Sequence, residues 1–133
     1  MAEPRYVLDH TGIEVADFAA SRAFYERVLE PLGFSVQMDF SEQFEAMGFG
    51  VPGKPSFWIR AAEGQPSGPH HIAFHATDRE RVDRFHEAAL AAGASDNGEP
   101  GLREHYHPTY YGAFVIDPDG NNVEAVCHAP PAG

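Results

Sequence analysis

The sequence contains two related halves, and this internal repeat limits the folds that the chain can adopt. Sixty-one positions separate His10 from His71, and the same spacing matches Asp17 with Asp78. The surrounding segments, DHTGIEVADFAASRAFYERVL and HHIAFHATDRERVDRFHEAAL, agree in their pattern of apolar and charged positions. The chain is therefore expected to contain two copies of one unit, each of which opens with a strand that carries a histidine.

The first copy, residues 6–60, has the pattern of one strand, one helix and three strands. Residues 6–15 alternate between polar and apolar positions, which predicts a strand with His10 on its polar face. Asp17 can cap a helix that runs to about residue 31. Further strands are expected near residues 34–40, 43–49 and 56–60.

The second copy, residues 70–128, repeats this order after a linker. Residues 61–69 are small, polar and rich in turn formers, as linkers commonly are. A strand is expected at His71, followed by a helix that Asp78 caps. The segment 96–108 is rich in Gly, Pro and His, which favours a long loop. Strands are expected near residues 102–106, 110–117 and 122–128, with a Pro118-Asp-Gly turn before the last strand.

One helix over a small sheet covers only one of the two sheet faces, so neither copy can bury its strands alone. The simplest arrangement places the helices outside and combines the eight strands in a curved sheet whose concave face lines a cleft. We therefore predict an α+β fold in a single domain, residues 1–133, built from two tandem β-α-β-β-β modules.

Three polar side chains are expected to face this cleft near the centres of strands: His10, His71 and Glu124. A buried polar group is costly unless it is paired, and a metal would pair all three at once. Two imidazoles and one carboxylate are the ligands of an open divalent-metal site. The residues therefore predict one bound divalent metal ion, with iron or manganese favoured and nickel or zinc as alternatives.

The most unusual local segment is HYHPTYYG, residues 105–112, just upstream of the last two strands. Its histidines and tyrosines can donate, accept and transfer protons. His105, His107 and Tyr110 are therefore candidate catalytic residues. The alternative is a loop that only closes the edge of the sheet.

Apolar side chains are expected to form the walls of the cleft. Phe49 and Trp58 are candidates for substrate binding in the first copy, with Glu14 and His75 nearer the rim. The single cysteine, Cys127, excludes an intrachain disulfide and is expected to be a small buried residue.

Composition excludes several classes of function. The formal net charge is −11 and Lys54 is the only lysine, which argues against nucleic-acid binding. No apolar run approaches the length of a membrane span, and MAEPRYVLDH lacks a signal-peptide pattern, so we expect a cytoplasmic protein without membrane contact. Phosphate-binding Gly-rich loops and nucleophile elbows are absent from the sequence.

With these modules and the segments LDHTGIEV, HHIAF and DPDGNNVEAV, residues 6–128 resemble the vicinal oxygen chelate superfamily. This superfamily includes glyoxalase I, type I extradiol dioxygenases, fosfomycin-resistance enzymes and bleomycin-resistance proteins. The resemblance implies that His10, His71 and Glu124 fall at metal-binding positions, and that the chain forms a homodimer. It leaves open whether the modules of one chain or of two chains close the cleft.

The sequence also departs from particular branches. When the last strands of the two copies are aligned, Trp58 falls opposite Glu124, where glyoxalase I has a fourth, carboxylate ligand. In the dioxygenase branch a tyrosine usually precedes the glutamate strand, and Phe114 stands at that position here. Tyr110 shares the parity of Phe114 and is a candidate to replace that tyrosine, with Phe114 as a substrate contact.

The resemblance implies a metal-dependent enzyme that acts on a small substrate through two adjacent oxygen atoms. Its chemistry would be that of a dioxygenase or of a glyoxalase-like lyase or isomerase. The alternative is a non-catalytic protein that binds and sequesters a small molecule, as in the bleomycin-resistance branch. A structural interaction module is a third hypothesis, which no motif supports.

Overall fold

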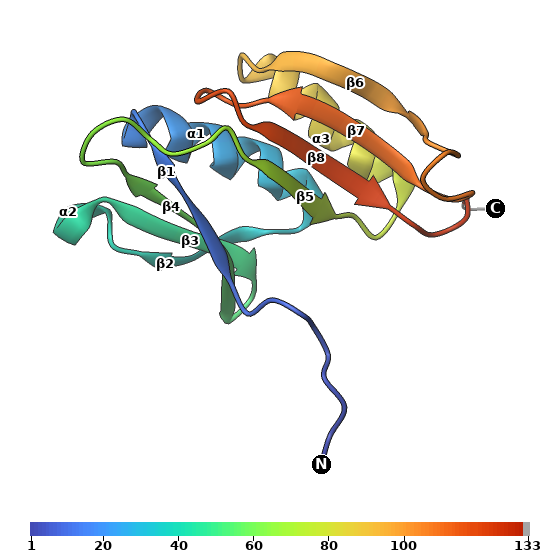
Figure 1. Cartoon of the computed structure of the whole chain (residues 1–133), viewed down its shortest axis with the longest axis horizontal. Helices are drawn as coiled ribbons and strands as arrows, with labels where there is room; N and C mark the ends of the chain where they lie inside the picture. Colours follow the sequence, from blue (N-terminus) through green and yellow to red (C-terminus); the bar gives the residue numbers. More distant parts are fainter. Residues whose placement is uncertain (132–133) are drawn as a thin grey trace.

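The computed structural model describes residues 1–131 and contains two successive modules (Figure 1). The first contains β1 (Thr11–Val15), α1 (Phe18–Leu29), β2 (Ser35–Asp39), α2 (Ser41–Phe44), β3 (Ala46–Val51) and β4 (Lys54–Ala61), with a short 3-10 helix (Glu30–Leu32) after α1. The second contains β5 (His71–His75), α3 (Arg79–Ala91), β6 (Ser95–Leu102), β7 (Tyr111–Ile116) and β8 (Asn122–Cys127). None of these helices is long and apolar enough to span a membrane.

The eight strands form two four-stranded sheets with the same topology. Their orders are β1-β4-β3-β2 and β5-β8-β7-β6. In each sheet the first and last strands of the module pair in parallel, and the other pairs are antiparallel. The predicted α+β class and the repeated β-α-β-β-β module are therefore confirmed, with the strands divided between two sheets that are not closed on each other.

The two modules share one hydrophobic core. Core side chains come from α1, α3 and one face of each sheet. Phe57 of β4 meets Phe74 of β5 with ring centroids 5.1 Å apart at 90°, and Tyr25 of α1 lies 5.1 Å from Phe57. Because each sheet turns one face toward this core, its other face is directed away from the core and toward solvent. These two outer faces are called the open faces of the sheets below.

Each long helix begins at an aspartate that caps it, as the sequence predicts. The Asp17 carboxylate accepts a hydrogen bond from the Ala20 amide at 3.1 Å, and Asp78 accepts one from the Arg81 amide at 2.9 Å. Asp17→Ala is therefore expected to lower the free energy of unfolding by about 1 kcal/mol, measured by urea denaturation. The matched control is Glu87→Ala, which removes an exposed carboxylate from the middle of α3 and should change stability by less than about 0.5 kcal/mol. Equal effects of the two substitutions would contradict the capping role.

Four local predictions are wrong. The first strand begins at Thr11, so residues 6–10 precede it and are exposed. The loop expected at 96–108 contains β6, because two irregularities in its register with β7 accommodate the Gly and Pro residues of this strand. The strand expected near 102–106 is a turn, and the segment expected to be a strand from residue 43 begins with the end of α2.

Candidate metal site

Two of the three predicted metal ligands meet on the open face of the second sheet. His71 and Glu124 lie on the paired strands β5 and β8, where Ala73 is the direct partner of Glu124. His71 Nε2 is 2.7 Å from Glu124 Oε1. Only 1% of Glu124 is exposed, whereas the His71 side chain is 56% exposed. The pair therefore combines a buried carboxylate with a solvent-exposed imidazole.

Tyr110 reaches the same carboxylate from the segment that precedes β7. Its hydroxyl donates a hydrogen bond to Glu124 Oε2, so both carboxylate oxygens have a partner. Burial, and then the hydrogen bond to Glu124, raise the pKa of Tyr110 above its ordinary value and keep the phenol protonated. The structure thus brings Tyr110 to the face where Phe114 pairs with Glu124 across β7 and β8.

The other two candidate catalytic residues lie in the loop between β6 and β7, residues 103–110. The ring centroids of His105 and Tyr106 are 4.2 Å apart, and those of Tyr106 and Tyr110 are 5.0 Å apart. His107 Nδ1 accepts a hydrogen bond from the Thr109 amide at 3.2 Å. Within residues 1–131, no hydrogen bond joins His105 or His107 to the His71–Glu124 pair, so their catalytic role stays a prediction.

His10 lies in the first module, directly before β1, and 62% of its side chain is exposed. Its Nδ1 is 2.8 Å from an Asp9 carboxylate oxygen, and Asp9 also binds Lys54 at 2.8 Å. Hydrogen bonding to Lys54, and then to His10, lowers the pKa of Asp9. Among residues 1–131 there is no group of three His, Cys, Asp or Glu side chains that could hold a metal. One chain therefore brings together two of the three predicted ligands.

The predicted apolar walls divide between the two faces of the first sheet. Trp58 is paired with Gly12 on one side and Gly48 on the other, and lies on the open face. Phe49 lies on the opposite, core face, because the register pairs it with the core residue Phe57, and it lines a small pocket between the modules. Its role as a substrate contact stays a prediction. Only 1% of Phe49 is exposed.

Phe114 lies on the open face of the second sheet. It is half-buried and directly opposite Glu124 in the pairing of β7 with β8. The Arg103 guanidinium lies 5.4 Å from its ring centroid, at a distance typical of cation–π contacts. Phe114 therefore stays a candidate substrate contact beside the carboxylate.

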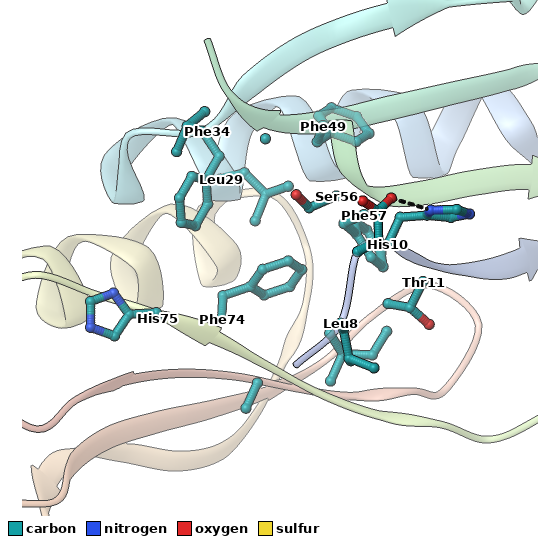
Figure 2. Close-up of a pocket in the computed structure, with 15 residues that line it drawn as sticks. Leu8, His10, Thr11, Leu29, Phe34, Phe49, Ser56, Phe57, Phe74 and His75 are labelled. Carbon is teal, nitrogen blue, oxygen red and sulfur yellow. Dashed lines mark hydrogen bonds and ion pairs between the residues drawn. The ribbon is translucent and has the colours of Figure 1, made fainter. Parts of the chain in front are cut away.

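A small pocket of about 280 Å³ opens between the two modules, at the margin of the shared core. Figure 2 shows its apolar lining, with Phe57 and Phe74 between His10 on one side and His75 on the other. The dashed line in Figure 2 marks the contact of His10 with Asp9. His10 therefore borders this apolar opening, whereas the His71–Glu124 pair does not line it.

A larger groove of about 620 Å³ lies on the open face of the first sheet. His10, Glu14 and Trp58 line it, together with Phe40 and Phe44 from the segment around α2. The strand predictions missed both phenylalanines because they placed Phe40 at the end of one strand and Phe44 near the start of the next, with no helical turn between them. The signal that could have identified them is their spacing of four residues, which places two side chains on one side of a helical turn.

Comparison with known proteins places this geometry in a family. Residues 7–125 match the Glyoxalase/Bleomycin resistance protein/Dioxygenase superfamily. The chain belongs to this superfamily. A glyoxalase/bleomycin resistance protein from Albidiferax ferrireducens is 28% identical, with a TM-score of 0.75 over 90% of this chain and 98% of that one. No curated protein matches the chain.

Two more distant structures share the fold. Lactoylglutathione lyase from Agrobacterium tumefaciens is 21% identical, with a TM-score of 0.66 over 95% of this chain and 96% of that one. The fosfomycin resistance protein FosX from Listeria monocytogenes is 19% identical, with a TM-score of 0.65 over 92% and 93% of the two chains. At these identities the similarity shows the fold alone.

Proposed function

We propose that the chain is a divalent-metal-dependent enzyme whose metal is held by His71 and Glu124 of one chain and His10 of a second copy. The observation that carries this proposal is the buried Glu124 carboxylate, which meets the exposed His71 imidazole at 2.7 Å on an open sheet face. The substrate would be a small molecule that binds through two adjacent oxygen atoms. The homodimer that this site requires is part of the proposal.

The donor atoms that are present fit such a metal. Imidazole nitrogen and carboxylate oxygen suit iron, manganese, nickel or zinc, and the single cysteine, Cys127, is buried in the core. Burial of a carboxylate is costly unless its charge is balanced. The hydrogen-bond partners of Glu124 are an imidazole and a phenol, so a metal cation would supply the charge that balances it.

A second copy is proposed because the two open faces of one chain are directed away from their shared core. Phe57 and Phe74 fill the space between the modules, so closing the open faces on each other would require this core to separate. β1 begins directly after His10, and β5 contains His71. Both are edge strands of their sheets. A two-fold symmetric pair would bring His10 of each chain to His71 and Glu124 of the other and make two equivalent sites.

A divalent metal at this position would polarise two adjacent substrate oxygens, which is compatible with lyase, isomerase or dioxygenase chemistry. The contribution of the protein is to hold the ligands and to move protons. Tyr110 fixes the orientation of the Glu124 carboxylate through its hydrogen bond. His105 and His107, in the loop that carries Tyr110, are the proposed proton carriers.

Elemental analysis of protein purified without a histidine tag tests this proposal. About one equivalent of metal per chain is expected, and His71→Ala should lower it at least about tenfold because one of three ligands is lost. The control is His86→Ala, since His86 is paired with Asp96 at 2.9 Å and does not touch the His71–Glu124 pair. Absence of bound metal, with no uptake of added iron, manganese, nickel or zinc, would refute the proposal.

A second candidate function is metal-independent binding of a small molecule, as in a sequestering protein. The aromatic groove around Trp58 favours it, because the indole replaces a potential fourth metal ligand with an apolar surface. The same elemental analysis separates the candidates, since a sequestering protein needs no metal.

A further inference from the structure

The groove on the open face of the first sheet has an aromatic wall formed by Phe40, Phe44 and Trp58. The Phe40 and Trp58 rings are nearly parallel, at 9°, with centroids 6.0 Å apart. Phe44 continues the arrangement, with its centroid 4.9 Å from that of Phe40 at 24°. The three rings therefore form one continuous stack, which we call the aromatic stack.

Two glycines allow the indole to lie close to the sheet. A Cβ at Gly48 would fall 2.8 Å from Trp58 Cε2, and a Cβ at Gly12 would fall 3.2 Å from Trp58 Cβ. Both glycines are the direct strand partners of Trp58. A side chain at Gly48 would displace the indole, so the two glycines leave room for the ring close to the strands on either side of it.

Part of the aromatic stack remains accessible. Parallel rings in contact are separated by roughly 3.5–4 Å, so a centroid distance of 6.0 Å means that Phe40 and Trp58 overlap only partly. Trp58 is half-buried and Phe44 is 59% exposed. An exposed aromatic surface beside a groove is typical of a binding site.

The charged groups in this groove already have partners. Arg60 Nη2 binds Glu14 Oε2 at 3.0 Å, and the Ser67 amide donates to Glu14 Oε1 at 3.4 Å. At the other end His10 is paired with Asp9. The aromatic rings thus offer the main contact area for a ligand, and flat π surfaces favour planar rings over saturated rings of the same size.

The equivalent connection of the second module has different chemistry. There the loop 103–110 carries His105, His107 and Tyr110 where the first module carries Phe40 and Phe44. One open face therefore offers groups that exchange protons, and the other offers aromatic surface.

From these contacts we infer that the groove binds a planar aromatic ring of the substrate against the aromatic stack. The substrate class is thus an aromatic compound with two adjacent oxygens near its ring. The adjacent oxygens rest on the proposed function, whereas the aromatic contact does not require a metal.

The test uses Trp58, the only tryptophan of the chain, as a fluorescent reporter in the metal-free full-length protein. Mandelate and its saturated analogue hexahydromandelate have the same charge and the same adjacent oxygens, and differ in the aromatic ring. Mandelate is expected to change Trp58 emission and to bind about 3- to 10-fold more tightly than hexahydromandelate. Equal affinities for the two probes, or no binding of mandelate, would overturn the inference.

Variants at Phe44 locate the contact. Phe44→Leu keeps an apolar side chain but removes the ring, and should abolish the preference for mandelate, as should Phe44→Ala. The control Leu90→Ala alters an exposed apolar residue of α3 and should keep the preference. A preference that survives both Phe44 variants would overturn the inference, as would a change of oligomeric state in them, since the rings would then cover a second copy.

Metal content distinguishes this inference from the proposed function. Phe44→Leu should bind as much metal as the wild type while losing its preference for mandelate. A wild-type protein that prefers mandelate but binds no metal would refute the proposed function and leave the aromatic site standing. A protein that binds metal without this preference would refute only the aromatic site.

Discussion

A heterodimer with His10→Ala in one chain and Glu124→Gln in the other is expected to keep about half of the wild-type metal. In the proposed dimer, one site of this heterodimer contains both substituted positions. The other site combines His71 and Glu124 of the His10→Ala chain with His10 of the Glu124→Gln chain, so all three of its ligands are intact. The intact site binds metal normally. Each homodimeric variant should bind almost none, because both of its sites lack a ligand. The heterodimer can be isolated through two different histidine-free tags, and its metal measured by elemental analysis.

The matched control places both substitutions in one chain, paired with an unaltered chain. Each site of that heterodimer then lacks one ligand, so almost no metal should bind. A site within a single chain predicts the reverse, with metal bound only when both substitutions share a chain. The two arrangements contain the same four side-chain types in the same amounts, so differences in expression or net charge cannot mimic the result. Metal in the second heterodimer and not in the first would refute the shared site.

The repeated fold could be predicted because its signals are local. Asp17 and Asp78 mark two helix starts at equivalent positions, and both cap their helices in the structure. Alternation along β5 also separates the two faces of this strand, because Phe74 lies in the core whereas His71 lies on the open face. Boundaries were harder, since β6 contains Gly98 and Pro100 within a strand that bulges allow.

The candidate site could be predicted only in part. Strand parity placed His71 and Glu124 on one face, and a bridging distance of 2.7 Å joins them. The alternation of side chains along a strand did not predict that Phe49 faces the core. Alternation shows which residues of a strand share a face, but not which of the two faces is buried. The relation of His10 to the other two residues depends on how whole modules pack, which no local pattern encodes.

The turn between β7 and β8 joins the two modules, and this role also depends on how the modules pack. The sequence DPDG, residues 117–120, predicts a turn, but it does not predict that this turn contacts the first module. Asp119 accepts a hydrogen bond from the Ala16 amide at 2.9 Å, just before α1. Asp117 accepts one at 2.5 Å from the Tyr25 hydroxyl in α1. These contacts connect the second module to the first across 103 and 92 residues of chain.

Asp117→Ala is expected to lower the free energy of unfolding by about 3–5 kcal/mol, a large share of the stability of a typical domain. The carboxylate is buried and also accepts from the Asn121 amide and side chain, at 2.8 and 2.9 Å. Burial, and then the Asp117 charge, raise the pKa of Tyr25 well above its ordinary value, so the buried phenol stays a donor. Removing Asp117 would leave that hydroxyl and the turn amides without an acceptor, and urea denaturation monitored by circular dichroism measures the cost.

A double-mutant cycle assigns this cost to the link between the modules. Tyr25→Phe alone should cost about 1–3 kcal/mol, because it removes one of the donors to a buried carboxylate. In the double variant the unsatisfied hydroxyl is gone, so its cost should fall short of the sum of the single costs by at least about 1 kcal/mol. Glu104→Ala, at an exposed carboxylate, serves as the control for loss of charge. Additive single costs would mean that the hydrogen bond between Tyr25 and Asp117 does not couple the modules.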